Sequence, residues 1–146
     1  MVDEIGWGPP INNIRTLIYF LGENIDANLA LRRKGTAYAS VRPSDIRTFV
    51  TAARMTKSIS QIARELGVSR QSAQASVHRL IKLGVLILET GSENKREKRV
   101  LVTARGLMAN KTAAEQILAE EEAMAKVIGR ENLEQLRSWL QKLLSP

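Results

Sequence analysis

Apolar residues in the first part of the chain recur at steps of three and four, the spacing of a helix with one buried face. They fall at Ile11, Ile14, Ile18, Leu21 and Ile25. Proline is tolerated in the first turn of a helix and glycine often follows its last turn. The pattern therefore predicts a helix from about Pro10 to Arg33, ended by Gly35.

Three shorter helices are expected in the middle of the chain. The first opens at Pro43, with an inner face formed by Ile46, Phe49, Val50 and Ala53. The second begins at Ser58, whose spacing to Gln61 is that of a capping box, and it ends at Gly67.

The last of these three helices begins after Ser69, a residue whose hydroxyl can cap free amides. It is expected to run from Arg70 to Leu83 and to end at Gly84.

After Gly84 the pattern of apolar and polar residues changes to one that predicts a β-hairpin. Residues 85–88 form a short apolar run with β-branched members, and residues 100–102 form a second. The polar segment 90–98 between them contains Gly91 and Asn94, which favour a turn. Two short strands with a basic tip are therefore predicted.

Two further helices complete the pattern. Thr103 can cap a helix that continues to about Ile128, where Gly129 breaks it. A last helix carries its apolar stripe at Leu133, Leu136, Leu140 and Leu143. The expected order is ααααββαα, a mainly α fold with a small β-wing.

Composition narrows the classes of function. The 146 residues suit a single domain, 1–146, and include no cysteine and only one histidine, His78. Thiol chemistry is therefore absent, and neither a metal site nor a cofactor is expected. No apolar run is long enough to cross a bilayer, and Asp3 and Glu4 are unlike a signal peptide, so we expect a cytoplasmic protein.

The net charge of +7 is concentrated in the middle of the chain. Residues 60–106 hold nine Lys/Arg against four Asp/Glu, a net +5, whereas residues 107–146 have a net −1 from five against six. A basic excess of this kind suggests an anionic partner.

Within this basic region the sequence has the spacing of a helix-turn-helix. Ala63 is small enough for a helix crossing, Gly67 can adopt a left-handed turn, and Val68 is expected to fill the core beneath that turn. In the second helix, Ala73, Val77 and Leu80 form the inner face.

The opposite face of that helix begins with side chains that can read base edges. They are Arg70, Gln71, Ser72 and Gln74. In helix-turn-helix proteins the start of the second helix enters the major groove. These residues could also form an ordinary solvent-exposed helix face with no role in binding. The helix-turn-helix spacing and the basic wing favour DNA contact instead.

Residues 67–86, together with the wing, resemble the MarR family of transcription regulators. The recognition-helix segment 67–80 and Gly84-Val85-Leu86 match its pattern, Asn94-Lys95-Arg96 is similar to its Asp-x-Arg wing motif, and residues 100–106 match its strand-to-helix junction. Asn94 stands where the family usually has Asp, and Arg42 stands where it usually has Thr or Ser.

The resemblance implies a homodimeric winged helix that binds a near-palindromic operator in double-stranded DNA. Residues 36–106 would form the DNA-binding lobe, and residues 10–34 and 107–146 the dimerisation helices. By analogy, Arg96 would reach the minor groove and Lys95 a phosphate. The candidate DNA contacts are Ser69, Arg70, Gln71, Ser72, Gln74, Arg79, Lys95 and Arg96.

A repressor released by a small aromatic or carboxylate effector is the function that the resemblance favours. Trp7, Tyr38 and Arg42 are candidates for lining an effector pocket, with Arg42 able to pair with a carboxylate. These aromatic residues could equally serve only in packing.

Two other classes of function were weighed. A winged helix used as a protein-interaction module would present an apolar recognition surface, whereas this one is polar and basic. An enzyme is disfavoured because the sequence has no glycine-rich phosphate loop and no catalytic motif, so no catalytic residue is assigned.

Overall fold

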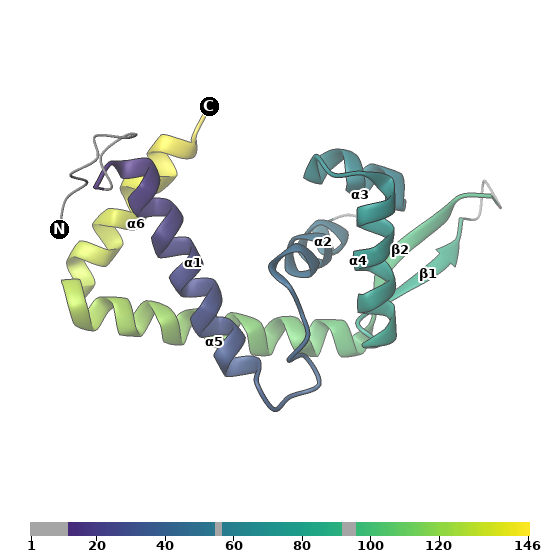
Figure 1. Ribbon diagram of the computed structural model, residues 1–146, viewed down its shortest axis with the longest axis horizontal. Coiled ribbons are helices and arrows are strands. Elements are labelled where there is room, and N and C mark those ends of the chain that lie inside the picture. The colour runs from purple at the N-terminus through teal and green to yellow at the C-terminus, as the bar shows by residue number, and fades with distance from the viewer. Residues whose placement is uncertain (1–11, 55–56, 92–95) are drawn as a thin grey trace, which may run out of the picture.

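The computed structural model describes residues 12–54, 57–91 and 96–146. Its elements follow the predicted order (Figure 1). They are α1 (Ile14–Arg33), α2 (Pro43–Arg54), α3 (Ile59–Leu66), α4 (Arg70–Lys82), β1 (Leu86–Thr90), β2 (Lys98–Val102), α5 (Ala104–Ile128) and α6 (Arg130–Leu144). The mainly α fold with a two-stranded wing is therefore confirmed.

Side-chain caps fix the starts of the helices. Ser58 and Gln61 form the predicted capping box at α3, and the hydroxyls of Ser69 and Thr103 each accept a backbone N–H in the first turn of α4 and α5. The predicted start of α1 near Pro10 is wrong, because the Asn13 side chain accepts from the Thr16 N–H at 2.9 Å and the helix begins after it.

The core of the winged lobe lies between α2, α3, α4 and the hairpin. It consists of buried alanine and aliphatic residues, which pack closely where the short helices cross. Its buried members are Ala52, Ile62, Ala63, Ala73, Val77, Leu80, Val85, Leu86 and Val100. The inner face predicted for α4 is confirmed.

The inner face predicted for α2 is partly wrong. Ile46 and Phe49 are half-buried, but Val50 and Ala53 are exposed. The fully buried positions are instead offset by one residue, at Asp45, Thr48, Thr51 and Ala52. This offset is possible because the polar groups are satisfied inside the lobe; the Thr48 hydroxyl, for example, donates to the Ser44 carbonyl.

Val68 is also misplaced by the sequence prediction, since it is 43% exposed rather than buried beneath the turn. The turn itself forms as expected. Gly67 has a φ of 64°, a left-handed conformation, and its N–H caps α3.

The wing is an antiparallel hairpin whose register runs from Leu86 opposite Val102 to Thr90 opposite Lys98. A third segment joins it, because the Val100 N–H donates to the Lys57 carbonyl at 2.8 Å. This bridge ties the segment before α3 to the sheet.

The molecule has two parts linked by α5 (Figure 1). At one end of α5 lies the winged lobe, and at the other α1 and α6 pack against it. The contact of α1 with α5 includes a buried carboxylate, Glu120, which accepts from Arg32 Nε at 2.8 Å and from Asn28 Nδ2 at 3.0 Å.

Candidate nucleic-acid interface

The first turn of α4 presents the side chains that the sequence predicted for base contact. Arg70, Gln71, Ser72 and Gln74 are all exposed. Ser69 is the N-cap, and its hydroxyl lies 2.9 Å from that of Ser72. The core on the other side of the helix holds this turn in place, so the polar residues are fixed on a rigid support.

Arg79, also predicted as a DNA contact, forms an ion pair with Asp45 of α2. Its Nη2 lies 2.7 Å from Asp45 Oδ1, and its Nε lies 3.1 Å from the same oxygen. The Arg79 side chain as a whole remains 35% exposed. The arginine therefore joins α4 to α2 while reaching the surface.

Asp45 is the centre of this buried network and is 1% exposed. The Ser76 hydroxyl donates to its Oδ1 at 2.8 Å, and the backbone N–H of Arg42 donates to its Oδ2 at 3.1 Å. Each carboxylate oxygen thus has partners, which offsets the cost of its burial.

Burial of Asp45 by itself would raise the pKa of its carboxyl. The hydrogen bond from Arg79, those from the Arg42 N–H and Ser76, and the positive charge of Arg79 outweigh that effect and hold the pKa below its ordinary value. The carboxylate is therefore charged at neutral pH.

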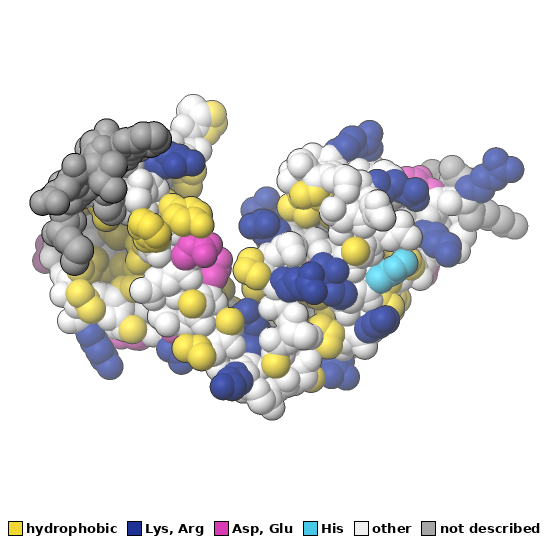
Figure 2. All heavy atoms as spheres, in the orientation of Figure 1, with side chains coloured by type: hydrophobic (Ala, Val, Ile, Leu, Met, Phe, Trp, Pro, Cys, Tyr) yellow, Lys and Arg dark blue, Asp and Glu magenta, His cyan; other side chains and the backbone are white. Residues whose placement is uncertain are grey.

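The wing carries the second set of predicted contacts. Arg96 is exposed at the turn that precedes β2, and Lys98 and Arg99 are exposed on the strand itself. Lys95 lies outside the described residues, so its expected phosphate contact stays a prediction. Figure 2 shows dark blue Lys and Arg side chains scattered over the winged lobe, one of them at the tip of the wing.

A cleft of about 470 Å³ lies between the first half of α2 and the side of α4 that faces it. Three arginines line it, namely Arg42, Arg47 and Arg79, together with Ser72 of the predicted recognition surface. The sequence analysis gave Arg47 no role. Its signal was weak, because a single arginine on a helix surface has many ordinary explanations.

Of the three candidate effector residues, Tyr38 and Arg42 lie in different surroundings. Arg42 lines the cleft beside α4. Tyr38 instead packs against the core of the lobe, and its hydroxyl accepts from Arg105 Nε at 3.3 Å. Trp7 lies outside the described residues. An effector site built from these three residues therefore stays a prediction.

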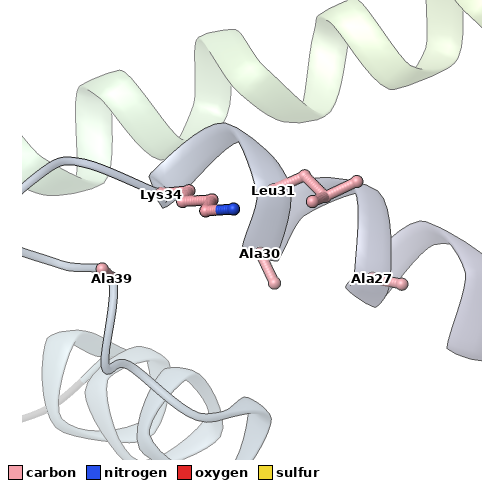
Figure 3. Close-up of a pocket in the computed structure, with 5 residues that line it drawn as sticks. All are labelled: Ala27, Ala30, Leu31, Lys34 and Ala39. Atoms are coloured by element: carbon pink, nitrogen blue, oxygen red, sulfur yellow. The ribbon is translucent and has the colours of Figure 1, made fainter.

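A second, shallower hollow lies where α1 meets the segment leading to α2 (Figure 3). It has a volume of about 440 Å³ and is lined by Ala27, Ala30, Leu31, Lys34 and Ala39. Its wall is apolar apart from Lys34. The sequence analysis did not anticipate it.

Other sites can be judged only in the part of the chain that the structure describes. There, no group of three His, Asp or Glu residues is placed to hold a metal ion. No helix among residues 12–54, 57–91 and 96–146 is long and apolar enough to cross a membrane.

Comparison with known proteins agrees with the resemblance found in the sequence. Residues 43–97, from the start of α2 into the wing, match the model of the MarR family. No curated protein matches the chain in sequence.

Solved structures of MarR-type proteins share the fold at low sequence identity. Apo MarR from E. coli has a TM-score of 0.76 at 15% identity, covering 94% of this chain and 100% of that one. The transcriptional repressor CouR, solved on a 23-mer DNA duplex, has a TM-score of 0.70 at 15% identity over 94% and 99% of the two chains. A MarR-family protein of Mycobacterium tuberculosis, in complex with p-aminosalicylic acid, has a TM-score of 0.69 at 16% identity over 91% and 99%.

Proposed function

From the premise that residues 43–97 form a MarR-family winged helix, we propose that this protein is a sequence-specific DNA-binding transcription regulator. One observation carries the proposal. The exposed first turn of α4 presents Arg70, Gln71 and Gln74, side chains suited to guanine and adenine edges, from a helix fixed by its buried face.

The proposed active form is a homodimer. Large apolar side chains are exposed on α1, α5 and α6, away from the winged lobe, and they need a partner surface. Among them are Leu17, Ile18, Phe20, Leu118, Val127, Trp139 and Leu143. A second copy offers the same surface, and it would place two winged lobes on the two halves of a near-palindromic operator.

Repression by occupancy of the operator is the mode of action we propose. The repressor CouR on DNA, with the same fold, supports this mode. In it, Arg96 would follow the wing into the minor groove.

Release by a small carboxylate effector is proposed at the hollow in Figure 3 rather than at Arg42. Its apolar wall suits an aromatic ring, and Lys34 supplies a cation for a carboxylate. The related structure with p-aminosalicylic acid supports this class of ligand.

The experiment that tests the function is a binding titration on fragments selected from genomic DNA, at several salt concentrations. Specific binding should weaken steeply with salt and survive competition by unrelated DNA. Gln71→Ala should lower the discrimination between operator variants by about 1–3 kcal/mol at the base it contacts. Addition of p-aminosalicylate should weaken operator binding if the effector proposal holds.

Gln135→Ala is a matched control, because Gln135 is exposed on α6 and should leave base preference unchanged. Equal retention of operator and unrelated DNA by the wild-type protein would contradict the proposed function. It would favour the alternative in which the winged helix binds another protein.

A further inference from the structure

The cleft between α2 and α4 differs from an ordinary surface hollow in the charges at its rim. It is lined by Arg42 and Arg47, whose side chains have neither an ion pair nor a hydrogen bond within the described residues. The third arginine, Arg79, is already neutralised by Asp45. Two uncompensated guanidinium groups therefore border one cavity.

Among the residues that the structure describes, no acidic side chain lines this cavity. Asp45 lies beneath it, 1% exposed, with its oxygens occupied by Arg79, Ser76 and the Arg42 N–H. The hydroxyls of Ser76 and Thr48 are also engaged in internal hydrogen bonds. The groups left to bind an occupant are the two arginines, with the hydroxyls of Ser44 and Ser72 as further donors. Two guanidinium groups favour a negatively charged oxyanion.

The position of the cleft indicates where that oxyanion comes from. Ser72, which lines it, also belongs to the exposed first turn of α4. An occupant would therefore lie next to the residues proposed to read bases. Ser44, in the first turn of α2, also lines the cleft, and the positive end of a helix dipole favours a negative charge near that turn.

We propose that this cleft binds one backbone phosphate of the operator in each half-site, between Arg42 and Arg47. The proposal rests on the proposed function and adds a phosphate anchor beside the base-reading turn. The anchor fixes α2 on the DNA backbone, and the Asp45–Arg79 pair carries that position to α4. The depth and register of α4 in the major groove then depend on a contact that itself reads no base.

A phosphate-by-phosphate substitution experiment tests the anchor. Each operator phosphate is replaced in turn by an uncharged methylphosphonate, and binding is measured for the wild-type protein and for Arg42→Ala/Arg47→Ala. For the wild type, one phosphate per half-site beside the bases contacted by α4 should cost about tenfold in affinity when neutralised. In the double variant, replacing that same phosphate should no longer lower the affinity. Replacing the other sensitive phosphates should still lower it as it does for the wild type.

The double variant itself should bind the intact operator at least tenfold more weakly, with a smaller salt dependence and an unchanged order of preference among operator variants. Arg47→Lys should recover part of the affinity, since it keeps the charge and loses the guanidinium fork. Both arginines are exposed, so the variants are expected to fold, which circular dichroism would verify.

Arg54→Ala is the matched control, because Arg54 is an exposed arginine at the other end of the same helix. In Arg54→Ala, replacing the sensitive phosphate by a methylphosphonate should still lower the affinity about tenfold. An equal loss of that sensitivity in Arg54→Ala would reduce the effect to general charge and overturn the anchor.

Two further outcomes separate the proposals. If the wild type binds its operator selectively but no phosphate is coupled to Arg42 and Arg47, the anchor is wrong and the proposed function stands. If it shows no selective DNA binding, both fail. A melting temperature raised by inorganic phosphate through Arg42 and Arg47, without any coupled phosphate in the operator, would assign the cleft to a free anion and overturn the anchor.

Discussion

Asp45 joins two helices of the winged lobe through a single side chain. It caps the start of α2 by accepting the Arg42 N–H, and it holds Arg79 of α4 from beneath. Because the same carboxylate serves both helices, the start of α2 and the middle of α4 have one fixed separation.

Asp45→Asn should therefore destabilise the protein. The amide keeps the shape but leaves the partly buried guanidinium of Arg79 without its counter-charge, and we expect a loss of about 1–3 kcal/mol in the free energy of unfolding at pH 7. Asp26→Asn is the control, since Asp26 is exposed on α1 and its loss should change little. Urea denaturation of both variants provides the measurement.

The same comparison has a defined dependence on pH. The pKa of Asp45 is lowered in the folded state, so its contribution is present above the unfolded pKa of about 4 and is lost as pH falls through the lower folded value. The difference between wild type and Asp45→Asn should shrink below about pH 4. A constant difference from pH 7 to pH 3 would contradict this account.

Sequence reasoning reached most surface residues of this site but not its buried network. Arg70, Gln71 and Gln74 could be assigned because a helix-turn-helix has a known outward face. Arg79 and Asp45 are 34 positions apart, and their pairing depends on how α2 crosses α4, which no local pattern encodes. Arg42 was predicted as an effector residue, which stays a prediction, and Arg47 was given no role, because a single arginine on a helix surface carries no specific signal.

At the level of elements, capping residues and glycines made the order of helices and strands predictable. Hydroxyls at Ser58, Ser69 and Thr103 satisfy amides that the following helix leaves free, so the signal is local in sequence. The inner face of α2 was harder to predict, because Asp45 is satisfied there by partners on α4 and Thr48 by the Ser44 carbonyl of its own helix. Hydrophobic periodicity alone then selects the wrong face, as it did for Val50 and Ala53.

Gly106 marks the tightest junction between elements, where the first turn of α5 meets the hairpin. A Cβ at this position would lie 2.3 Å from the Val85 carbonyl oxygen and 2.8 Å from a Val102 methyl group. The Val85 carbonyl belongs to the backbone and can move away only at a cost in free energy. Gly106→Ala should therefore destabilise the fold by about 1–3 kcal/mol, although alanine is the better helix former.

Gly22→Ala is the matched control for this prediction. Among the described residues of the protomer, nothing lies within 4 Å of a Cβ at Gly22 in α1, so the higher helix propensity should act alone and stabilise by up to about 1 kcal/mol. In thermal unfolding, the melting temperature should therefore fall for Gly106→Ala and rise for Gly22→Ala. A stabilising Gly106→Ala would refute the close packing of α5 on the hairpin.

At the scale of the whole molecule, the surface is divided between two kinds of contact. The winged lobe presents basic and polar side chains, whereas the part formed by α1, α6 and the end of α5 exposes large apolar ones (Figure 2). Phe20 on α1 is 55% exposed and Leu143 on α6 is 76% exposed in the single protomer. Such a surface is consistent with the proposed dimer.

Phe20→Asp tests the dimer with little disturbance of the protomer core. The charge should oppose burial against a second copy, so sizing with light scattering should report a monomer at micromolar concentration. Operator affinity should fall by on the order of 100-fold, because two linked half-site contacts become independent. Val68→Asp, at an exposed apolar residue of the winged lobe, should remain dimeric. If Phe20→Asp remained dimeric, the dimer interface would not include Phe20 and would have to lie on another surface.

Helix α5 connects the two parts of the molecule as a single long helix. Its 25 residues form a rod about 37 Å long, with one end fixed under the hairpin by Gly106 and the other packed with α1 and α6. A tilt of about 5° at the helical end would swing the winged lobe by about 3 Å, close to the rise of about 3.4 Å per base pair. A small tilt of α5 near α1 would thus displace the winged lobe by about the rise of one base pair.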